Sequence, residues 1–271
     1  MGQKLNLPFT PEGTFVNLVL NGNYVGLYWF GEAIKTGDNL VKIDEETDVL
    51  LELDDYFDSK QRFRSAIKNF PYNIKNESDI TTKRLKEIAS EIKKIENRLY
   101  DSNGIVKTPL PEDFGKGIDL DSFAGFFIVN EIMRNIDISF MKSCYFIFDG
   151  KSKTLFASPI WDFDSCLWEN DTVSICKNNL YYDALFSLPA FLETVCEKLD
   201  SNAILFDEIA SHLDSRTEEL KEAATLDSFR WSEHPDVSGH YRGDFFDAVQ
   251  FLKTALQTRI KYLKTTMNHR E

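Results

Sequence analysis

The sequence has 271 residues, of which 44 are acidic and 31 are basic, so the chain carries a formal net charge of −13 at pH 7. Proteins that bind nucleic acid neutralise its phosphates with a basic face, and this acidic balance disfavours that class. The chain contains no apolar run of the roughly 20 residues that a membrane-spanning helix needs, and no secretory signal peptide is visible at its start. Hydrophobic residues make up 42% of the chain, so we expect a soluble globular protein with a sizeable core.

The first predicted element is a β-hairpin over residues 14–32. Two runs rich in apolar and aromatic residues flank Asn21 and Gly22, and an Asn-Gly pair readily adopts the positive φ angles of a tight hairpin turn. A further strand is predicted over residues 48–53, and the short apolar run 40–43 is a candidate partner for it.

Two helices of different character are predicted next. One begins at Ser78 and carries a single apolar stripe, which predicts a helix with one buried face and one solvated face; the stripe consists of Leu85, Ile88, Ile92, Ile95 and Leu99. The other runs from about Leu120 to Asn135 and is apolar around most of its circumference, which predicts a buried central helix.

Two short strands are predicted after the buried helix, over residues 144–148 and 154–157. Three more helices follow, over residues 181–199, 203–226 and 244–264. Strands therefore come first and helices later, with one hairpin between helices. This order is typical of an α+β protein with a smaller sheet part and a larger helical part.

Acidic side chains stand at two places that could carry chemistry. Asp137 comes at the end of the buried helix, and Asp162 and Asp164 follow the second short strand. In extended backbone, residues i and i+2 point to the same side, so the latter two carboxylates can bind one hard cation through their oxygen atoms. The alternative for an isolated Asp-x-Asp pair is the capping of a turn.

The order of these acidic segments along the chain favours one kind of metal-dependent chemistry. A buried helix that ends in Asn135-x-Asp137, then a β-hairpin, then a second acidic turn is the order of the catalytic loop and metal-binding turn of protein kinases. In that arrangement one aspartate orients the substrate hydroxyl, and a later aspartate holds magnesium against the phosphates. The sequence therefore suggests phosphoryl transfer.

At these residues the sequence resembles the CotH kinase family (spore-coat protein H-like), a family of atypical protein kinases. The segments that carry the resemblance are spread over nearly the whole chain: residues 21–28 with Glu32, 50–56, 123–137, 143–145, 159–164 and 259–263. Ser158 stands where the family's motif before Pro159 has glycine. The ordered set is far more specific than any one of its segments.

The resemblance implies a protein-kinase-like α+β fold in a single domain, residues 1–271. It implies a small, incomplete β-rich lobe over residues 1–75 and a larger, mainly helical lobe over residues 76–271, with an inserted hairpin at 144–158. The implied activity is the ATP-dependent phosphorylation of Ser or Thr on a protein substrate, with Mg²⁺ or Mn²⁺. Because the family is largely exported or surface-attached, the resemblance also implies an extracellular or cell-surface location.

The family's functional residues can be assigned position by position. The resemblance makes Asp137 the catalytic carboxylate and gives Asn135 the role of supporting its loop. Asp162 becomes the metal-binding aspartate, with Asp164 as a second ligand. Glu32, at the end of the first hairpin, is placed near the adenine of ATP, and a plain ion pair at the strand end is an equal alternative for it.

Two departures bear on activity. Ordinary kinases have a metal-binding Asn five residues after the catalytic aspartate, and here Lys142 occupies that position. Family members also have a further part of the small lobe before the hairpin, which supplies the basic residue that grips the phosphates. The lysines among the first fifty residues are Lys4, Lys35 and Lys42, and none lies in a segment that matches this role. The chain is therefore expected to be a truncated kinase domain, or an inactive one.

Two other functions remain open. A non-catalytic scaffold could use a kinase-like fold to bind a partner through a groove of exposed aromatic residues, for which the candidates are Trp161, Trp168, Trp231, Tyr181 and Tyr182; core packing explains most of them more simply. A structural calcium site is the other alternative, with Asp162, Asp164, Glu169 and Asp171 as ligands. The oligomeric state is not determined by the sequence.

Overall fold

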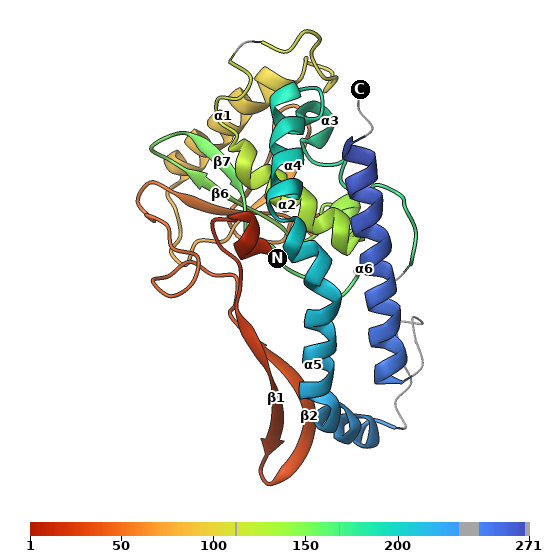
Figure 1. The fold of residues 1–271 in the computed structure, drawn as a ribbon. Coiled ribbons are helices and arrows are strands. Elements are labelled where there is room, and N and C mark those ends of the chain that lie inside the picture. Colours follow the sequence, from red (N-terminus) through yellow and green to blue (C-terminus); the bar gives the residue numbers. More distant parts are fainter. Residues whose placement is uncertain (112, 168, 233–243, 269–271) are drawn as a thin grey trace.

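The computed structural model describes residues 1–111, 113–167, 169–232 and 244–268 (Figure 1). Its elements, in chain order, are η1 (Gly2–Leu5), β1 (Gly13–Leu20), β2 (Asn23–Gly31), β3 (Val49–Leu53), β4 (Arg62–Arg64), β5 (Pro71–Ile74), α1 (Thr82–Leu99), α2 (Leu120–Met133), η2 (Ile136–Phe140), β6 (Cys144–Asp149), β7 (Thr154–Ala157), α3 (Tyr182–Leu185), α4 (Pro189–Ser201), α5 (Ala203–Arg230) and α6 (Phe245–Asn268). The fold is mixed α+β, as predicted.

A five-stranded antiparallel sheet lies at the centre, in the order β4-β5-β3-β6-β7. Strand β3 pairs with β5 on one side and with β6 on the other, so that Leu53 lies opposite both Tyr72 and Cys144. The hairpin that the sequence placed between helices is therefore part of the same sheet as the early strands. Through this pairing, residues 1–75 and 76–271 share one sheet.

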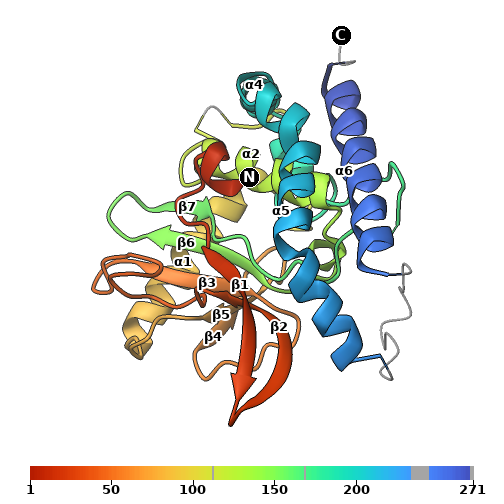
Figure 2. The same ribbon diagram turned by 60° about the horizontal axis from the view of Figure 1, so that its bottom comes forward.

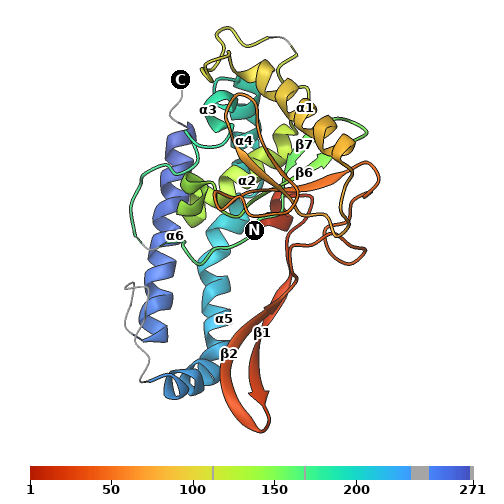
Figure 3. The same ribbon diagram turned by 180° about the vertical axis from the view of Figure 1, so that it is seen from behind.

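The two faces of the sheet differ. The main core lies on the face covered by α1 and α2, where Leu51, Leu53 and Phe146 pack against the buried α2. Helices α4 and α6 pack on α2 in turn, and α5 lies beside α6, as seen from behind in Figure 3. The opposite face carries a small separate apolar cluster, formed by Ile34, Val41, Leu50, Tyr145 and Ile147.

Strands β1 and β2 form a separate two-stranded ribbon that projects from the rest of the molecule (Figure 2). The ribbon contacts the far end of α5, where the backbone N–H of Leu27 donates to Asp227 Oδ1 at 2.7 Å and Arg230 donates to the carbonyl of Tyr24 at 3.2 Å. Much of its apolar surface is exposed, and Phe30 is 72% exposed.

Most of the predicted elements are present. The first hairpin, strand 48–53, the buried helix and the second hairpin are confirmed. The prediction of the long helix was wrong at its start, because Thr81 and not Ser78 caps it: the Thr81 side chain accepts from the backbone N–H of Arg84. None of the described helices is long and apolar enough to span a membrane.

Two strands were missed, and two local predictions were wrong. Strands β4 and β5 were missed, although β5 is the neighbour of β3 in the sheet. The run 40–43 forms only an isolated bridge between Val41 and Thr36. The helix predicted over 181–199 is interrupted, because Pro189 begins α4 as a new helix after the single turn of α3.

Candidate active site

Three carboxylates converge at one end of the sheet. Asp137 lies on η2, directly after α2, while Asp162 and Asp164 lie on the segment that follows β7. One oxygen atom from each of the three lies within 4.8 Å of the others. Asp137 is half-buried and the other two are exposed. The structure thus brings together the two acidic places that are separate in the sequence.

Asn135 holds the backbone of Asp137 in place. Helix α2 ends at Met133, and the next residue, Arg134, adopts a left-handed conformation with φ of 49°. The Asn135 side chain then caps η2, because its Oδ1 accepts from the backbone N–H of Asp137 at 3.2 Å. Its Nδ2 donates to Oδ1 of the buried Asn130 at 3.0 Å. Asn135 therefore connects the position of Asp137 to the interior of α2.

Hydroxyl groups hold the other two carboxylates. Ser143, just before β6, donates to Asp162 Oδ2 at 2.9 Å, and Ser165 donates to Asp164 Oδ1 at 3.2 Å. Asp162 has a positive φ of 60°, in the left-handed region that aspartate tolerates better than most residues. This turn directs Asp162 toward the loop of Asp137, and sequence reasoning gave Ser143 no defined role.

The electrostatics of the cluster favour a divalent cation. Burial, and then the negative charges of Asp162 and Asp164, raise the pKa of Asp137, while Lys142 and Ser165 act in the opposite direction. Three carboxylates this close repel one another unless a positive charge compensates them. Because carboxylate oxygens are the ligands that Mg²⁺ and Mn²⁺ prefer, the donor set fits such an ion.

Lys142, at the position of the kinase metal-binding Asn, contacts both the loop of Asp137 and the side chain of Tyr56. Its backbone N–H donates to the carbonyl of Asp137 at 3.0 Å. Its ammonium group lies 5.1 Å from the centre of the exposed Tyr56 ring, a cation–π contact. The contact with Tyr56 gives the Lys142 side chain a partner outside the acidic cluster.

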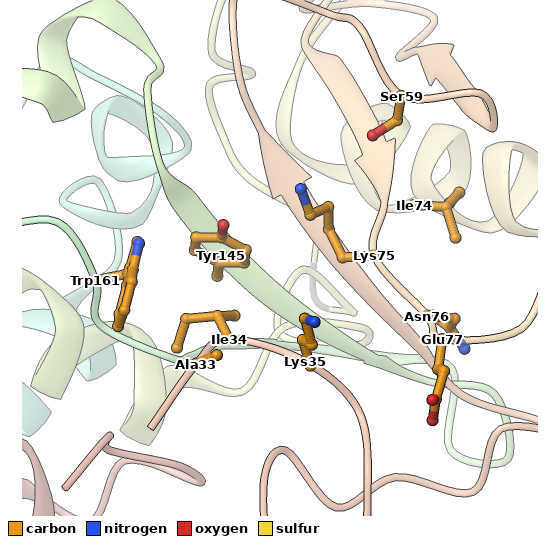
Figure 4. A pocket seen from close by; sticks show the side chains of 10 residues that line it. All are labelled: Ala33, Ile34, Lys35, Ser59, Ile74, Lys75, Asn76, Glu77, Tyr145 and Trp161. Carbon is orange, nitrogen blue, oxygen red and sulfur yellow. The ribbon is translucent and has the colours of Figure 1, made fainter. Parts of the chain in front are cut away.

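A pocket of about 590 Å³ lies on the face of the sheet opposite α2, where Ile34 and Tyr145 of the small apolar cluster line it (Figure 4). Its lining residues are Ala33, Ile34, Lys35, Ser59, Ile74, Lys75, Asn76, Glu77, Tyr145 and Trp161. Trp161 immediately precedes Asp162, and Tyr145 is two residues after Ser143. These two segments therefore contribute both to the pocket and to the surroundings of the cluster.

Glu32 directly precedes Ala33, which lines this pocket. It directly follows β2, and its carboxylate accepts from the backbone N–H of Glu12 at 2.9 Å. Ala33, the next residue, lines the pocket, whereas the Glu32 side chain is not among the lining residues. The observed contact thus closes the base of the hairpin.

An ion pair formed by the pocket residue Lys75 was missed by sequence reasoning, which considered only lysines among the first fifty residues. The Lys75 ammonium lies 3.2 Å from Oε2 of Glu52, which is buried on β3. Burial is the main cause of the raised pKa of Tyr145, and its hydrogen bond to Glu52 contributes. The usable signal was the placement of Lys75 directly after a strand, but this strand was itself not predicted.

Glu169 and Asp171 are separate from the acidic cluster. Arg134 donates to Glu169 Oε2 and to Asp171 Oδ1, both at 2.8 Å. Among the described residues, the group of convergent acidic side chains consists of Asp137, Asp162 and Asp164. The calcium site suggested with Glu169 and Asp171 as ligands is therefore wrong in its ligand set.

The aromatic candidates for a partner-binding groove lie in different places. Tyr181 and Tyr182 are fully buried in the main core, Trp161 lines the pocket, and Trp231 follows the end of α5. Position 168 is outside the described residues. Core packing thus explains both tyrosines.

The comparisons with known proteins agree with this geometry. No curated protein matches the sequence. A scan against protein families matches the family described as CotH kinase protein over residues 3–271, nearly the whole chain. The match includes the loop of Asp137 and the turn of Asp162 and Asp164, whose carboxylates the fold brings together. The chain belongs to the CotH kinase family.

Proposed function

We propose that this protein transfers the γ-phosphoryl group of ATP to Ser or Thr side chains of a protein substrate. The observation that carries the proposal is the convergence of Asp137, Asp162 and Asp164 within 4.8 Å, beside a pocket that contains two lysines. Phosphoryl transfer depends on positioning and on the neutralisation of charge, and these are the features that the site offers.

Asp162 and Asp164 would hold Mg²⁺ or Mn²⁺. When bound, the ion neutralises charge on the phosphates and orients them. Ser143 keeps Asp162 turned toward the site through its 2.9 Å hydrogen bond. Both carboxylates are exposed, so the ion and the phosphates can reach them from solvent.

Asp137 would accept the proton of the substrate hydroxyl and orient that hydroxyl for attack. A group in this role must be within hydrogen-bond reach of the hydroxyl while staying close to the phosphates. Its position beside the metal-binding pair meets the second condition. Asn135 acts through Asp137 by fixing its backbone, so we regard Asn135 as a positioning residue.

The pocket would bind ATP. Its volume of about 590 Å³ lies within the usual range of small-molecule sites, roughly 300–1,000 Å³. Tyr145, Trp161, Ile34 and Ile74 supply aromatic and apolar surface for the adenine, and Glu32 lies near it in this proposal. Lys75 supplies positive charge for the phosphates.

The Lys75–Glu52 ion pair supports Lys75 as the lysine that binds the phosphates, for which the first fifty residues offered no candidate. In protein kinases a Lys–Glu pair fixes the lysine that contacts the phosphates. Here Glu52 is buried and lies 3.2 Å from the Lys75 ammonium, so it restricts where that ammonium can go. Lys35 contributes a second positive charge to the same pocket.

The direct test is transfer of radioactive phosphate from [γ-³²P]ATP to casein, to myelin basic protein and to the enzyme itself, with Mg²⁺ or Mn²⁺. Phosphorylated residues are then identified by mass spectrometry. We expect phosphoserine or phosphothreonine with the wild-type protein and with Asp38→Asn, which removes an exposed carboxylate outside the site. Asp137→Asn should lose activity by about 10²–10⁴-fold. Transfer that is unaffected by Asp137→Asn, or absent from every acceptor, contradicts the proposal.

A second candidate, a non-catalytic binding protein, is favoured by one observation. The β1–β2 ribbon exposes a group of large apolar side chains, among them Phe15, Val19, Leu20, Trp29 and Phe30. Exposed apolar patches of this kind often mark interaction sites. This candidate predicts no binding of ATP, and loss of partner binding when Trp29 and Phe30 are replaced by Ser.

We also propose a cell-surface or extracellular location, which membership of the CotH kinase family supports. Surface labelling of intact cells or spores with an antibody to the folded protein tests it. Labelling that appears only after lysis contradicts the proposed location.

A further inference from the structure

In one stretch of this acidic protein, all the charged residues are basic. Residues 59–75 contain no Asp or Glu and carry Lys60, Arg62, Arg64, Lys68 and Lys75, in a chain with a net charge of −13. The three lysines each form an ion pair: Lys60 with Asp79, Lys68 with Asp183 and Lys75 with Glu52. Arg62 and Arg64 are the two remaining basic residues of this stretch.

Arg62 and Arg64 have no carboxylate partner within the described part of the chain. Arg62 donates to the carbonyl of Ser59 at 2.7 Å, and Arg64 donates to the carbonyl of Asn69 at 3.2 Å. Both guanidinium groups also lie over the ring of Phe57, at 5.0 and 4.7 Å from its centre. Both residues are exposed. The two positive charges are thus held in place without being neutralised.

The strand explains why the two arginines act together. Residues i and i+2 of a strand point to the same face, so Arg62 and Arg64 share one side of β4, with the Phe57 ring beneath both. Phe63, between them, stacks on Tyr72 on the core side. A guanidinium has several N–H donors in a rigid plane, so two adjacent ones match the oxygens of a carboxylate or phosphate.

The arginine pair lies on the same face of the sheet as the pocket. Arg62 is opposite Asn73, Asn73 is opposite Glu52, and Glu52 is opposite Tyr145, which lines the pocket. Directly opposite residues share a face, and adjacent strands lie about 4.8 Å apart, so this row spans roughly 14 Å. Tyr145, at the end of this row, is close enough to the acidic cluster for the negative charge of Asp162 to contribute to its raised pKa. The row therefore gives the order of the separation between the arginine pair and the cluster, which an extended peptide of about four residues covers at about 3.3 Å per residue.

The loop that carries Phe57 also touches the loop of Asp137. The backbone N–H of Asp55 donates to the carbonyl of Met141 at 3.1 Å, and Tyr56 contacts Lys142. Residues 55–57 therefore run from the catalytic loop to the ring beneath the two arginines. A peptide whose hydroxyl reached Asp137 would have this path available for its flanking residues.

We propose that Arg62 and Arg64 bind an anionic side chain of the protein substrate, a carboxylate or a phosphate, about four residues from the acceptor hydroxyl. The proposal rests on the proposed kinase function and names the class of substrate. A net charge of −13 repels such a substrate at long range, but charges are screened beyond about 8 Å at physiological ionic strength. The local charge at β4 therefore decides whether the peptide binds.

The activity test compares three peptides that share one acceptor serine and differ four residues away, where they carry Glu, phosphoserine or Gln. The quantity measured is the ratio of kcat/KM for each anionic peptide to that for the Gln peptide. We expect the wild-type ratio to be about tenfold or more, and to fall to near one in the Arg62→Gln/Arg64→Gln double variant. Arg216→Gln/Lys221→Gln removes the same charge from exposed positions on α5 and should keep the ratio.

Binding of the same peptides, labelled with a fluorophore, to Asp137→Asn provides a test that needs no phosphoryl transfer. Fluorescence anisotropy should show tighter binding of the Glu and phosphoserine peptides than of the Gln peptide. This difference in affinity should become smaller at 0.5 M NaCl. If the wild-type protein shows no kinase activity and Asp137→Asn still binds the anionic peptides more tightly, the arginine site is supported and only the proposed kinase function is refuted. Equal binding of all three peptides to Asp137→Asn overturns the inference. So does a double variant, Arg62→Gln/Arg64→Gln, in which the KM for ATP rises while the ratio of kcat/KM between anionic and Gln peptides stays at the wild-type value.

Discussion

Arg259 of α6 and Glu131 of α2 form a fully buried ion pair. The guanidinium donates to the backbone carbonyl of Glu131 at 2.9 and 2.7 Å and to its carboxylate at 2.7 Å. The other carboxylate oxygen of Glu131 accepts from the backbone N–H groups of Ile175 and Cys176, at 3.0 and 2.7 Å. One pair therefore ties the last helix, the end of α2 and the segment after the acidic turn together.

Replacement of Arg259 by Met should strongly destabilise the protein. It leaves the Glu131 carboxylate buried without its cation, which typically costs about 3–5 kcal/mol. Urea denaturation followed by circular dichroism measures the free energy of unfolding. Lys261→Met, at an exposed position on the same helix, serves as the control and should change it by less than about 0.5 kcal/mol. Equal stability of the two variants would show that the pair contributes nothing.

Loss of the Asn135 side chain should impair catalysis through Asp137. In Asn135→Ala the backbone N–H of Asp137 loses its acceptor and Asn130 loses a partner, so we expect about 1–3 kcal/mol of destabilisation. Asn135→Asp keeps the acceptor and should keep more activity. In steady-state kinetics of Asn135→Ala, kcat should fall while the KM for ATP changes little. A change confined to the KM for ATP would place Asn135 in nucleotide binding instead.

Lys75 should be needed for nucleotide binding. We expect Lys75→Met to weaken ATP binding by about 10–100-fold, because a charge-assisted contact with the phosphates is lost. Isothermal titration calorimetry measures the Kd. Lys75→Arg should retain part of the affinity, since it preserves the ion pair with Glu52. Lys42→Met, at an exposed position that does not line the pocket, is the matched control, and an equal effect there would refute the assignment.

Glu96 should make the protein less stable as the pH rises. Its carboxylate is buried, where it accepts from the backbone N–H of Ile67 at 2.8 Å, and burial raises its pKa above the ordinary value of 4.5. The folded protein therefore holds the proton more tightly than the unfolded chain. The resulting stability is fully present below pH 4.5 and is lost as the pH rises through the folded pKa.

Glu96→Gln tests this dependence, because it removes the titration while keeping an acceptor for Ile67. The free energy of unfolding should fall less steeply with pH above 4.5 in this variant than in the wild type. Glu87→Gln, at a more exposed position on the same helix, should leave the wild-type slope intact. Identical slopes for Glu96→Gln and the wild type would contradict the prediction.

The parts of the fold that the sequence predicted are those with strong local patterns. Asn21 and Gly22 mark the first hairpin turn, and the apolar circumference of residues 120–133 identifies α2 as buried. The missed strands are short and lack such a pattern: β4 has three residues, two of them arginines, and β5 begins with Pro71. Their pairing with β3 depends on contacts that no local signal shows.

The same distinction applies to the candidate site. Asp137, Asp162 and Asp164 could be proposed because their order along the chain resembles that of a known family. Lys75 could not, because its approach to Glu52 requires β5 to pair with β3 in the observed register. The arginine pair likewise depends on strand β4 and on the packing of Phe57 beneath it.

Calorimetric titration of ATP, with and without Mg²⁺, into the wild-type protein, Asp162→Asn and Asp38→Asn tests the metal–nucleotide site most directly. If the three carboxylates form that site, the wild type and Asp38→Asn bind ATP much more tightly with Mg²⁺ than without it, and Asp162→Asn loses this dependence. If Asp162→Asn binds Mg²⁺ and ATP as the wild type does, or if no form binds ATP at millimolar concentration, the cluster is not a kinase metal site.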